Sequence, residues 1–149
     1  MATTRVSIMA SRTKTPHMKT KTSSVVLIAF AAVAGSAVTA SAQSASLDGA
    51  WSGGGKVTMP SGAVESARCR INYNRESKSS YSANASCATP SGRVNQSVSL
   101  RQTGANTFSG SFYNAEYGVT GSINVVVSGS SQSISLNGGG ASASLRLSR

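Results

Sequence analysis

Apolar and polar residues alternate along the chain from about residue 49 to its end. Residues 67–73 and 119–127, for example, have an apolar residue or glycine at every second position. No stretch after residue 42 has the 3.6-residue period of an amphipathic helix. Because successive side chains of a β-strand point to opposite faces, this alternation predicts an all-β protein whose strands are buried on one face.

Turn-forming residues divide the alternation into eight short strands. Residues 59–62 (MPSG) and 89–92 (TPSG) are near copies. In such turns, proline fixes φ at the second position and glycine accepts a positive φ. Eight sequential antiparallel strands with one apolar face predict an up-and-down barrel, because closure removes both sheet edges. A two-sheet β-sandwich is the alternative.

The N-terminal part of the chain has a different pattern. Lys14, Lys19 and Lys21 precede a small-apolar run over residues 24–40, and Ala40 and Ala42 fit a cleavage site. This pattern predicts a signal peptide over residues 1–42, with Met18 as an alternative start. Residues 43–48 are then expected to form a flexible N-terminal segment, and residues 49–149 a single barrel domain. The mature protein is expected in the periplasm or secreted, without a membrane span.

Composition removes several classes of enzyme. Nine of the fourteen basic residues and all four acidic residues follow the predicted cleavage site, so the mature chain stays basic. His17 is the sole histidine and leaves with the signal peptide. Histidine-based catalytic triads and histidine-ligated metals are thereby excluded. We expect a protein that is not an enzyme and has no catalytic residues, metal or cofactor.

The two cysteines test the proposed strand register. Cys69 and Cys87 have the same parity and are centred on residue 78, within the turn expected over residues 75–80. They are therefore expected to face each other on neighbouring antiparallel strands and to form a disulfide, as is usual in an exported protein.

The two ends of the barrel domain resemble the calycin superfamily, which includes lipocalins, avidins and bacterial metallopeptidase inhibitors of the alkaline-protease-inhibitor type. The resemblance rests on Gly49-Ala50-Trp51 and on the closing residues 145–149 (LRLSR). The inhibitors are closest in plan, with an opening Leu-x-Gly-x-Trp (here residues 47–51) and one early disulfide. The resemblance implies that a basic residue of the last strand packs across Trp51. Parity points Arg149 inward with Trp51, and Arg146, which points outward, is the alternative partner.

Two surface regions are candidate contact sites. A basic face on the second to fourth strands is a candidate site for an anionic cell-envelope component; it comprises Arg68, Arg70, Arg75, Lys78, Arg93 and Arg101. The connection containing Tyr113, Asn114, Glu116 and Tyr117 is a candidate contact loop. The alternatives are a solubilising face and an ordinary turn. Nucleic acid is not expected as a partner, since the outward faces of these strands lack stacking aromatic residues.

The barrel interior offers a further candidate. Gly53, Gly55, Gly110 and Gly121, with two alanines, are small inward residues that either leave a ligand cavity or mark bends in the strands. We therefore expect a non-catalytic binding protein that takes a small apolar molecule or an envelope component. The alternatives are a peptidase inhibitor, with a protease as partner, and a structural surface or adhesion protein.

Overall fold

The computed structural model describes residues 43–149, so the predicted signal peptide and the alternative start at Met18 lie outside the described residues. Eight strands make up the regular structure of this part: β1 (Gly49–Thr58), β2 (Val64–Arg75), β3 (Ser80–Thr89), β4 (Gly92–Gln102), β5 (Thr107–Asn114), β6 (Val119–Ser128), β7 (Ser131–Gly138) and β8 (Ala141–Ser148). Residues 43–149 contain no helix with the length and apolar character needed to cross a membrane.

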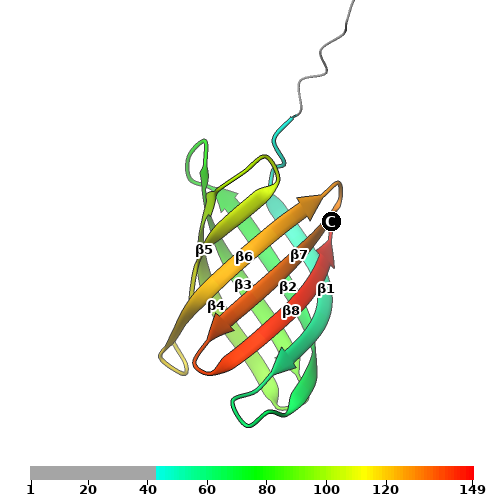
Figure 1. Ribbon diagram of the computed structural model, residues 1–149, viewed down its shortest axis with the longest axis vertical. Helices are drawn as coiled ribbons and strands as arrows, with labels where there is room; N and C mark the ends of the chain where they lie inside the picture. The colour runs from blue at the N-terminus through cyan, green and yellow to red at the C-terminus, as the bar shows by residue number, and fades with distance from the viewer. Residues whose placement is uncertain (1–42) are drawn as a thin grey trace, which may run out of the picture. The chain divides into compact units, whose positions relative to one another are not determined.

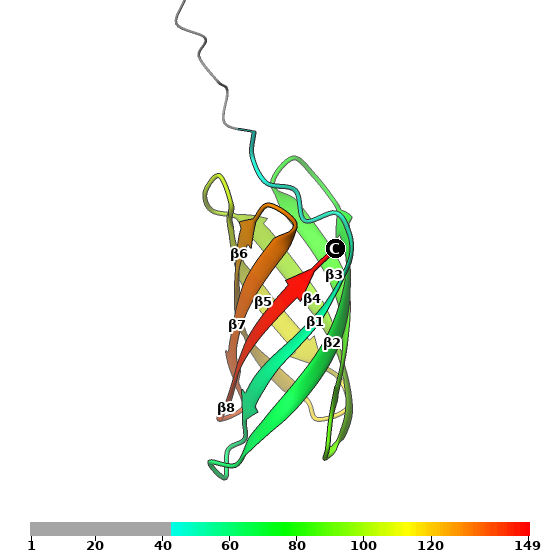
Figure 2. The same ribbon diagram turned by 90° about the vertical axis from the view of Figure 1, so that its right-hand side faces the viewer.

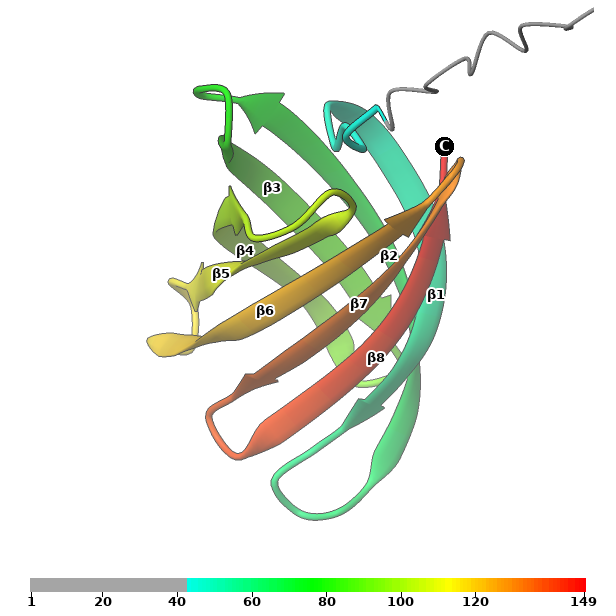
Figure 3. The same cartoon turned by 45° about the horizontal axis from the view of Figure 1, so that its top comes forward.

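The eight strands form one closed antiparallel barrel, as predicted, and the sandwich alternative is wrong (Figures 1 and 3). Each strand pairs with its neighbours in sequence, and β1 also pairs with β8. In that last ladder Ser52 lies opposite Ser148, and Thr58 lies opposite Ser142. Closure leaves no free sheet edge along this ladder.

The barrel has two different ends. The upper end in Figures 1 and 2 carries the N-terminal segment, the chain terminus at Arg149 and the turns β2–β3, β4–β5 and β6–β7; we call it the plugged end. The opposite end carries the other four turns, and we call it the open end. Gly62 and Gly118 in open-end turns have φ values of 86° and 61°, which explains why glycine occupies these positions.

Inward side chains pack the plugged half of the barrel. Most strands alternate buried and exposed positions, as the sequence pattern predicted, whereas in β1 Trp51 alone is buried. The largest fully buried side chains lie at or near the plugged end and are Trp51, Tyr73, Tyr81, Phe108 and Leu47. Towards the open end, the inward residues Val57, Cys87, Val119 and Ala143 are only partly buried.

The inward glycines mark bends where strands approach each other closely. A Cβ atom on Gly53 would collide with the backbone carbonyl of Arg146, and one on Gly110 with that of Ser99. Gly55 and Gly121 face neighbouring carbonyls in the same way. These positions allow the strongly curved sheet that a small barrel requires, and they do not line the cavity described below.

The N-terminal segment, residues 43–48, contacts the plugged end of the barrel. The Ala45 N–H donates to the carbonyl of Ala105 in the β4–β5 turn. Leu47 is fully buried within the core. Burial of this leucine beside Trp51 explains why the segment follows the barrel end rather than leaving it.

Candidate functional site

The barrel interior is hollow at its open end. A cavity of about 370 Å³ begins beyond the packed core and opens between the turns of that end. Its wall is mostly apolar and includes Val57, Val94, Phe112, Leu136, Leu145 and the Cys69–Cys87 disulfide. The cavity exists because the inward residues near the open end, such as Val119 and Ala143, are too small to meet across the barrel.

Two inward carboxamides interrupt this apolar wall. Asn114, the last residue of β5, is buried, and its side-chain oxygen accepts a 3.0 Å hydrogen bond from the Tyr117 N–H. Gln96 of β4 also lines the cavity. A carboxamide both donates and accepts hydrogen bonds, so these two groups are able to orient a ligand that has a polar atom.

The mouth of the cavity includes Tyr117, Pro60 and Ser91. The Tyr117 side chain is 64% exposed although it lies beside an apolar cavity. Beside the mouth, Glu65 accepts hydrogen bonds from the Ser91 hydroxyl and the Ser91 N–H. Hydrogen bonds from Ser91 and then Thr89 lower the pKa of the Glu65 carboxyl, which favours its charged form at this mouth.

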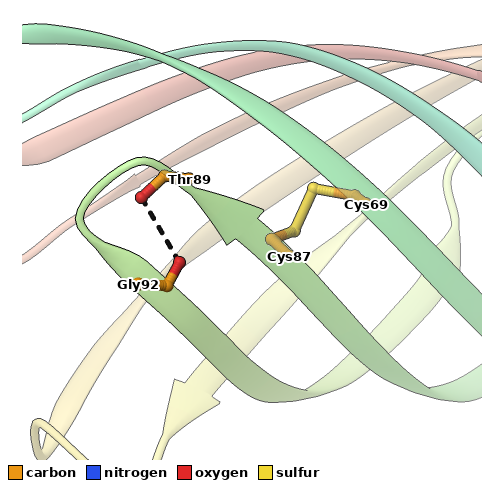
Figure 4. Close-up of a disulfide and its surroundings, with 4 residues drawn as sticks. All are labelled: Cys69, Cys87, Thr89 and Gly92. Atoms are coloured by element: carbon orange, nitrogen blue, oxygen red, sulfur yellow. Dashed lines mark hydrogen bonds between the residues drawn. A yellow bond between two sulfur atoms is a disulfide. The ribbon is translucent and has the colours of Figure 1, made fainter.

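The predicted disulfide is present. Cys69 of β2 lies directly opposite Cys87 of β3, and the two residues are bonded (Figure 4). Figure 4 also shows the neighbouring hydrogen bond, in which the Thr89 hydroxyl donates to the Gly92 carbonyl at 3.4 Å. The disulfide therefore links β2 to β3 beside the β3–β4 turn and forms part of the cavity wall.

Trp51 and Arg149 meet at the plugged end. The guanidinium carbon of Arg149 lies 4.6 Å from the centre of a Trp51 ring, and an Arg149 N–H donates to the Asp48 carbonyl. The Trp51 indole N–H donates to the Leu47 carbonyl at 2.8 Å. The structure thus selects Arg149, as parity predicted, whereas Arg146 lies on the outer face of β8.

A small polar cluster lies inside the plugged end. The Tyr73 hydroxyl donates to the side-chain oxygen of Gln132 at 3.3 Å, and burial raises the pKa of Tyr73 well above its ordinary value. The Tyr81 ring packs edge-on against Phe108, and its hydroxyl has no partner within residues 43–149. The cluster faces packed side chains and is separate from the cavity.

The six residues of the predicted basic face fall into two groups. Arg68, Arg70 and Arg93 share the outer face of β2 and β4 towards the open end, whereas Arg75, Lys78 and Arg101 lie near the plugged end. Arg75 forms a 3.2 Å salt bridge with Asp48, donates to Ser46 and lies over the Tyr81 ring, so its charge is largely engaged.

The expected contact loop is split among three environments. Tyr113 points outward from β5, and Glu116 is exposed in the β5–β6 turn. Asn114, which we expected to be exposed, is instead buried and faces the cavity, and Tyr117 lies exposed at the cavity mouth. Sequence reasoning assigned Asn114 to the loop, although its even position matches Phe112 and marks it as inward. The inward positions of Gln96 and Gln132 were also missed. Each is a polar residue in a row of otherwise apolar inward residues, and its position in that row was the available signal.

The acidic residues and cysteines of residues 43–149 offer no metal site. In the part of the chain that the structure describes, no three His, Cys, Asp or Glu side chains form a group suited to a metal ion. Glu65 lies in β2 and Glu116 in the β5–β6 turn, so their carboxylates belong to different elements.

Solved structures of designed barrels share this fold. They include a redesigned β-barrel, mFAP1, bound to DFHBI (TM-score 0.59, 11% identity, covering 69% of this chain and 94% of that one). A related design, mFAP0 bound to DFHBI, has a TM-score of 0.60 at 11% identity, covering 69% and 98%. A third structure, a fluorescence-activating β-barrel designed de novo, has a TM-score of 0.54 at 13% identity, covering 68% and 92%.

Two of the three barrels are bound to DFHBI, but at these identities the likeness shows the fold alone. It agrees with the calycin-like plan without assigning the chain to a family. Scans against protein-family models and curated proteins found no match.

Proposed function

We propose that this protein is an exported, non-catalytic binding protein that takes a small apolar molecule into the open end of its barrel. The cavity is the observation that carries this proposal. Its volume of about 370 Å³ falls within the usual range for ligand pockets. Its wall combines apolar side chains with the carboxamides of Gln96 and Asn114, which suits a mostly apolar ligand with one or two polar atoms.

Export to the periplasm or the outside of the cell belongs to the same proposal. The support is the signal-peptide pattern over residues 1–42 and the Cys69–Cys87 disulfide, because such bonds persist in oxidising compartments. The absence of histidine after His17 and the wide spacing of the carboxylates favour binding over catalysis.

The inhibitor-like alternative has less support. An inhibitor of that plan acts through a free N-terminal segment that enters a protease cleft. Here Ala45 is hydrogen-bonded to the β4–β5 turn and Leu47 is buried in the core. If cleavage occurs after Ala42, as proposed, only the exposed residues Gln43 and Ser44 precede this anchor.

The test is titration of the mature protein with N-phenylnaphthylamine, an uncharged dye that fluoresces in apolar surroundings. We expect saturable, one-to-one binding that responds little to salt, because the cavity wall is apolar. The variant Ala143→Phe places a ring in the cavity and should weaken binding by about tenfold or more.

The matched control is Val126→Phe, which adds a ring of the same kind on the outer face of β6, where Val126 is 47% exposed. This variant should bind the dye as the wild type does. Circular dichroism of both variants establishes that the barrel remains folded. Equal affinity of all three proteins would place the dye outside the cavity and overturn the proposal.

A further inference from the structure

A shallow trough crosses the outer surface of the barrel, away from the cavity. It has a volume of about 970 Å³ and runs across β1, β2, β3 and β4 towards β5, perpendicular to the strands. Its floor is the backbone at Trp51, Ile71, Ala85 and Gln96, which lie in register on successive strands. The trough forms because small outward residues such as Ser52 and Ser86 leave this backbone uncovered.

Two rows of outward side chains form the walls of the trough. One row contains Asn72, Asn84, Ser97 and Tyr113, which pair in register across β2 to β5. The second contains Ser148, Ser52, Arg70, Ser86 and Asn95, which pair in register across β8 to β4. Carboxamides and hydroxyls both donate and accept hydrogen bonds, which matches the hydroxyl groups of a sugar chain.

A row of arginines runs beside the trough. Arg146, Gly54, Arg68, Ala88 and Arg93 lie in register on β8, β1, β2, β3 and β4. Gly54 and Ala88 have little or no side chain, so no large side chain separates the three arginines. Neighbouring arginines of the row are separated by one intervening strand, which places their backbones about 10 Å apart. From the sequence, Arg146 was considered only as an alternative partner of Trp51 and was not included in the basic face.

The charges of this face are unopposed. The two wall rows and the arginine row contain four arginines and no acidic residue. The only salt bridge among the described residues joins Arg75 to Asp48 at the plugged end. Guanidinium groups bind carboxylates and sulfates through paired hydrogen bonds, so this row favours a ligand with repeated acidic groups.

We propose that the trough and the arginine row together bind an acidic polysaccharide. Its sugar rings lie in the trough against the Asn and Ser side chains, and its acidic groups contact Arg70 and the arginine row. Single-stranded nucleic acid fits less well, because it needs a series of stacking aromatic residues and the trough walls offer only Tyr113. This inference is independent of the cavity.

The test measures binding of the mature protein to polygalacturonate, an unbranched polymer of a sugar acid, at low and at physiological ionic strength. We expect saturable binding that weakens as salt rises, no binding to neutral dextran, and weaker binding to a single-stranded oligothymidine. Arg68→Gln with Arg93→Gln should lower the affinity for polygalacturonate by about tenfold or more.

Two further variants distinguish a specific binding site from attraction of the polymer to the net positive charge of the protein. Lys78→Gln with Arg101→Gln removes the same charge near the plugged end and should change the affinity less than about threefold. Asn72→Ala with Asn84→Ala leaves the net charge unchanged and should still weaken binding, because it removes hydrogen bonds in the trough. Equal losses in both charge variants with no loss in the asparagine variant would overturn the proposal. So would tighter binding to oligothymidine than to polygalacturonate.

Discussion

The hydroxyl groups of Tyr73 and Tyr81 lie in the same packed region and differ in their partners. Tyr73 donates to Gln132, while the hydroxyl of Tyr81 and the side-chain nitrogen of Gln132 are unpaired within residues 43–149. A buried polar group without a partner costs about 1–3 kcal/mol, whereas a typical hydrogen bond contributes about 1 kcal/mol. Removing one oxygen atom from each tyrosine should therefore have opposite effects.

We expect Tyr73→Phe to lower the free energy of unfolding by about 1–3 kcal/mol, because it leaves the Gln132 oxygen without a donor. Tyr81→Phe keeps the edge-on contact with Phe108 and should leave stability unchanged or raise it by about 1 kcal/mol. Urea unfolding followed by circular dichroism measures both. Equal destabilisation by the two substitutions would show that the Tyr81 hydroxyl has a partner in solution.

Single positions also show what alternation does and does not predict. Parity correctly placed Trp51 and Arg149 together, because period two fixes the face of every residue once a strand is recognised. The same rule applied to Gln96, Asn114 and Gln132 places each one inward. From the sequence, Asn114 was placed in an exposed loop and neither glutamine was singled out, and only the packed barrel shows that Gln96 and Asn114 line a cavity and that Gln132 meets Tyr73.

At the scale of the strands, the sequence predicts pairing well and curvature poorly. Turn residues and alternation are local signals, so the eight hairpin-linked strands and the Cys69–Cys87 register followed from them. The role of Gly53 and Gly110 depends on how closely the next strand approaches, which is set by the whole barrel. For this reason the sequence left open whether the inward glycines line a cavity or mark bends.

The disulfide joins β2 to β3, and its removal should weaken the whole barrel. Its loop spans 18 residues, which corresponds to about 3 kcal/mol in the loop-entropy estimate. We expect Cys69→Ala with Cys87→Ala to lower the free energy of unfolding by about this amount. Wild-type protein unfolded with a reductant should reach the same midpoint. Two titratable thiols in the untreated native protein would instead mean that the bond does not form.

At the scale of the whole molecule, closure divides the barrel into a plugged and an open end. The large residues Trp51, Tyr73, Tyr81 and Phe108 gather at the plugged end. Strand order and tilt bring them to one level although they come from four different strands. The sequence of any single strand does not predict which end of the barrel is hollow, because the cavity depends on side chains from different strands that meet across the barrel.

Closure itself rests on the β1–β8 ladder and on the contacts that Arg149 makes beside it. Arg149 lies over Trp51 and donates to Asp48, which ties the end of β8 to the segment before β1. Arg146 belongs to the same strand and has the same charge, but it points outward. The two residues therefore form a matched pair for testing how the ends are held together.

We expect Arg149→Ala to lower the free energy of unfolding by about 0.5–1 kcal/mol, the usual size of an exposed cation–π contact. Arg146→Ala should change it by less than about 0.5 kcal/mol, as is normal for a surface position. Trp51→Ala should lower the free energy of unfolding by about 3–5 kcal/mol, because it leaves a cavity in the packed core at the plugged end. Urea unfolding is followed by Trp51 fluorescence for the arginine variants and by circular dichroism for Trp51→Ala. If Arg146→Ala weakens the barrel and Arg149→Ala does not, the roles of the two arginines are reversed. If Trp51→Ala leaves the free energy of unfolding unchanged, packing around Trp51 does not stabilise the closed barrel.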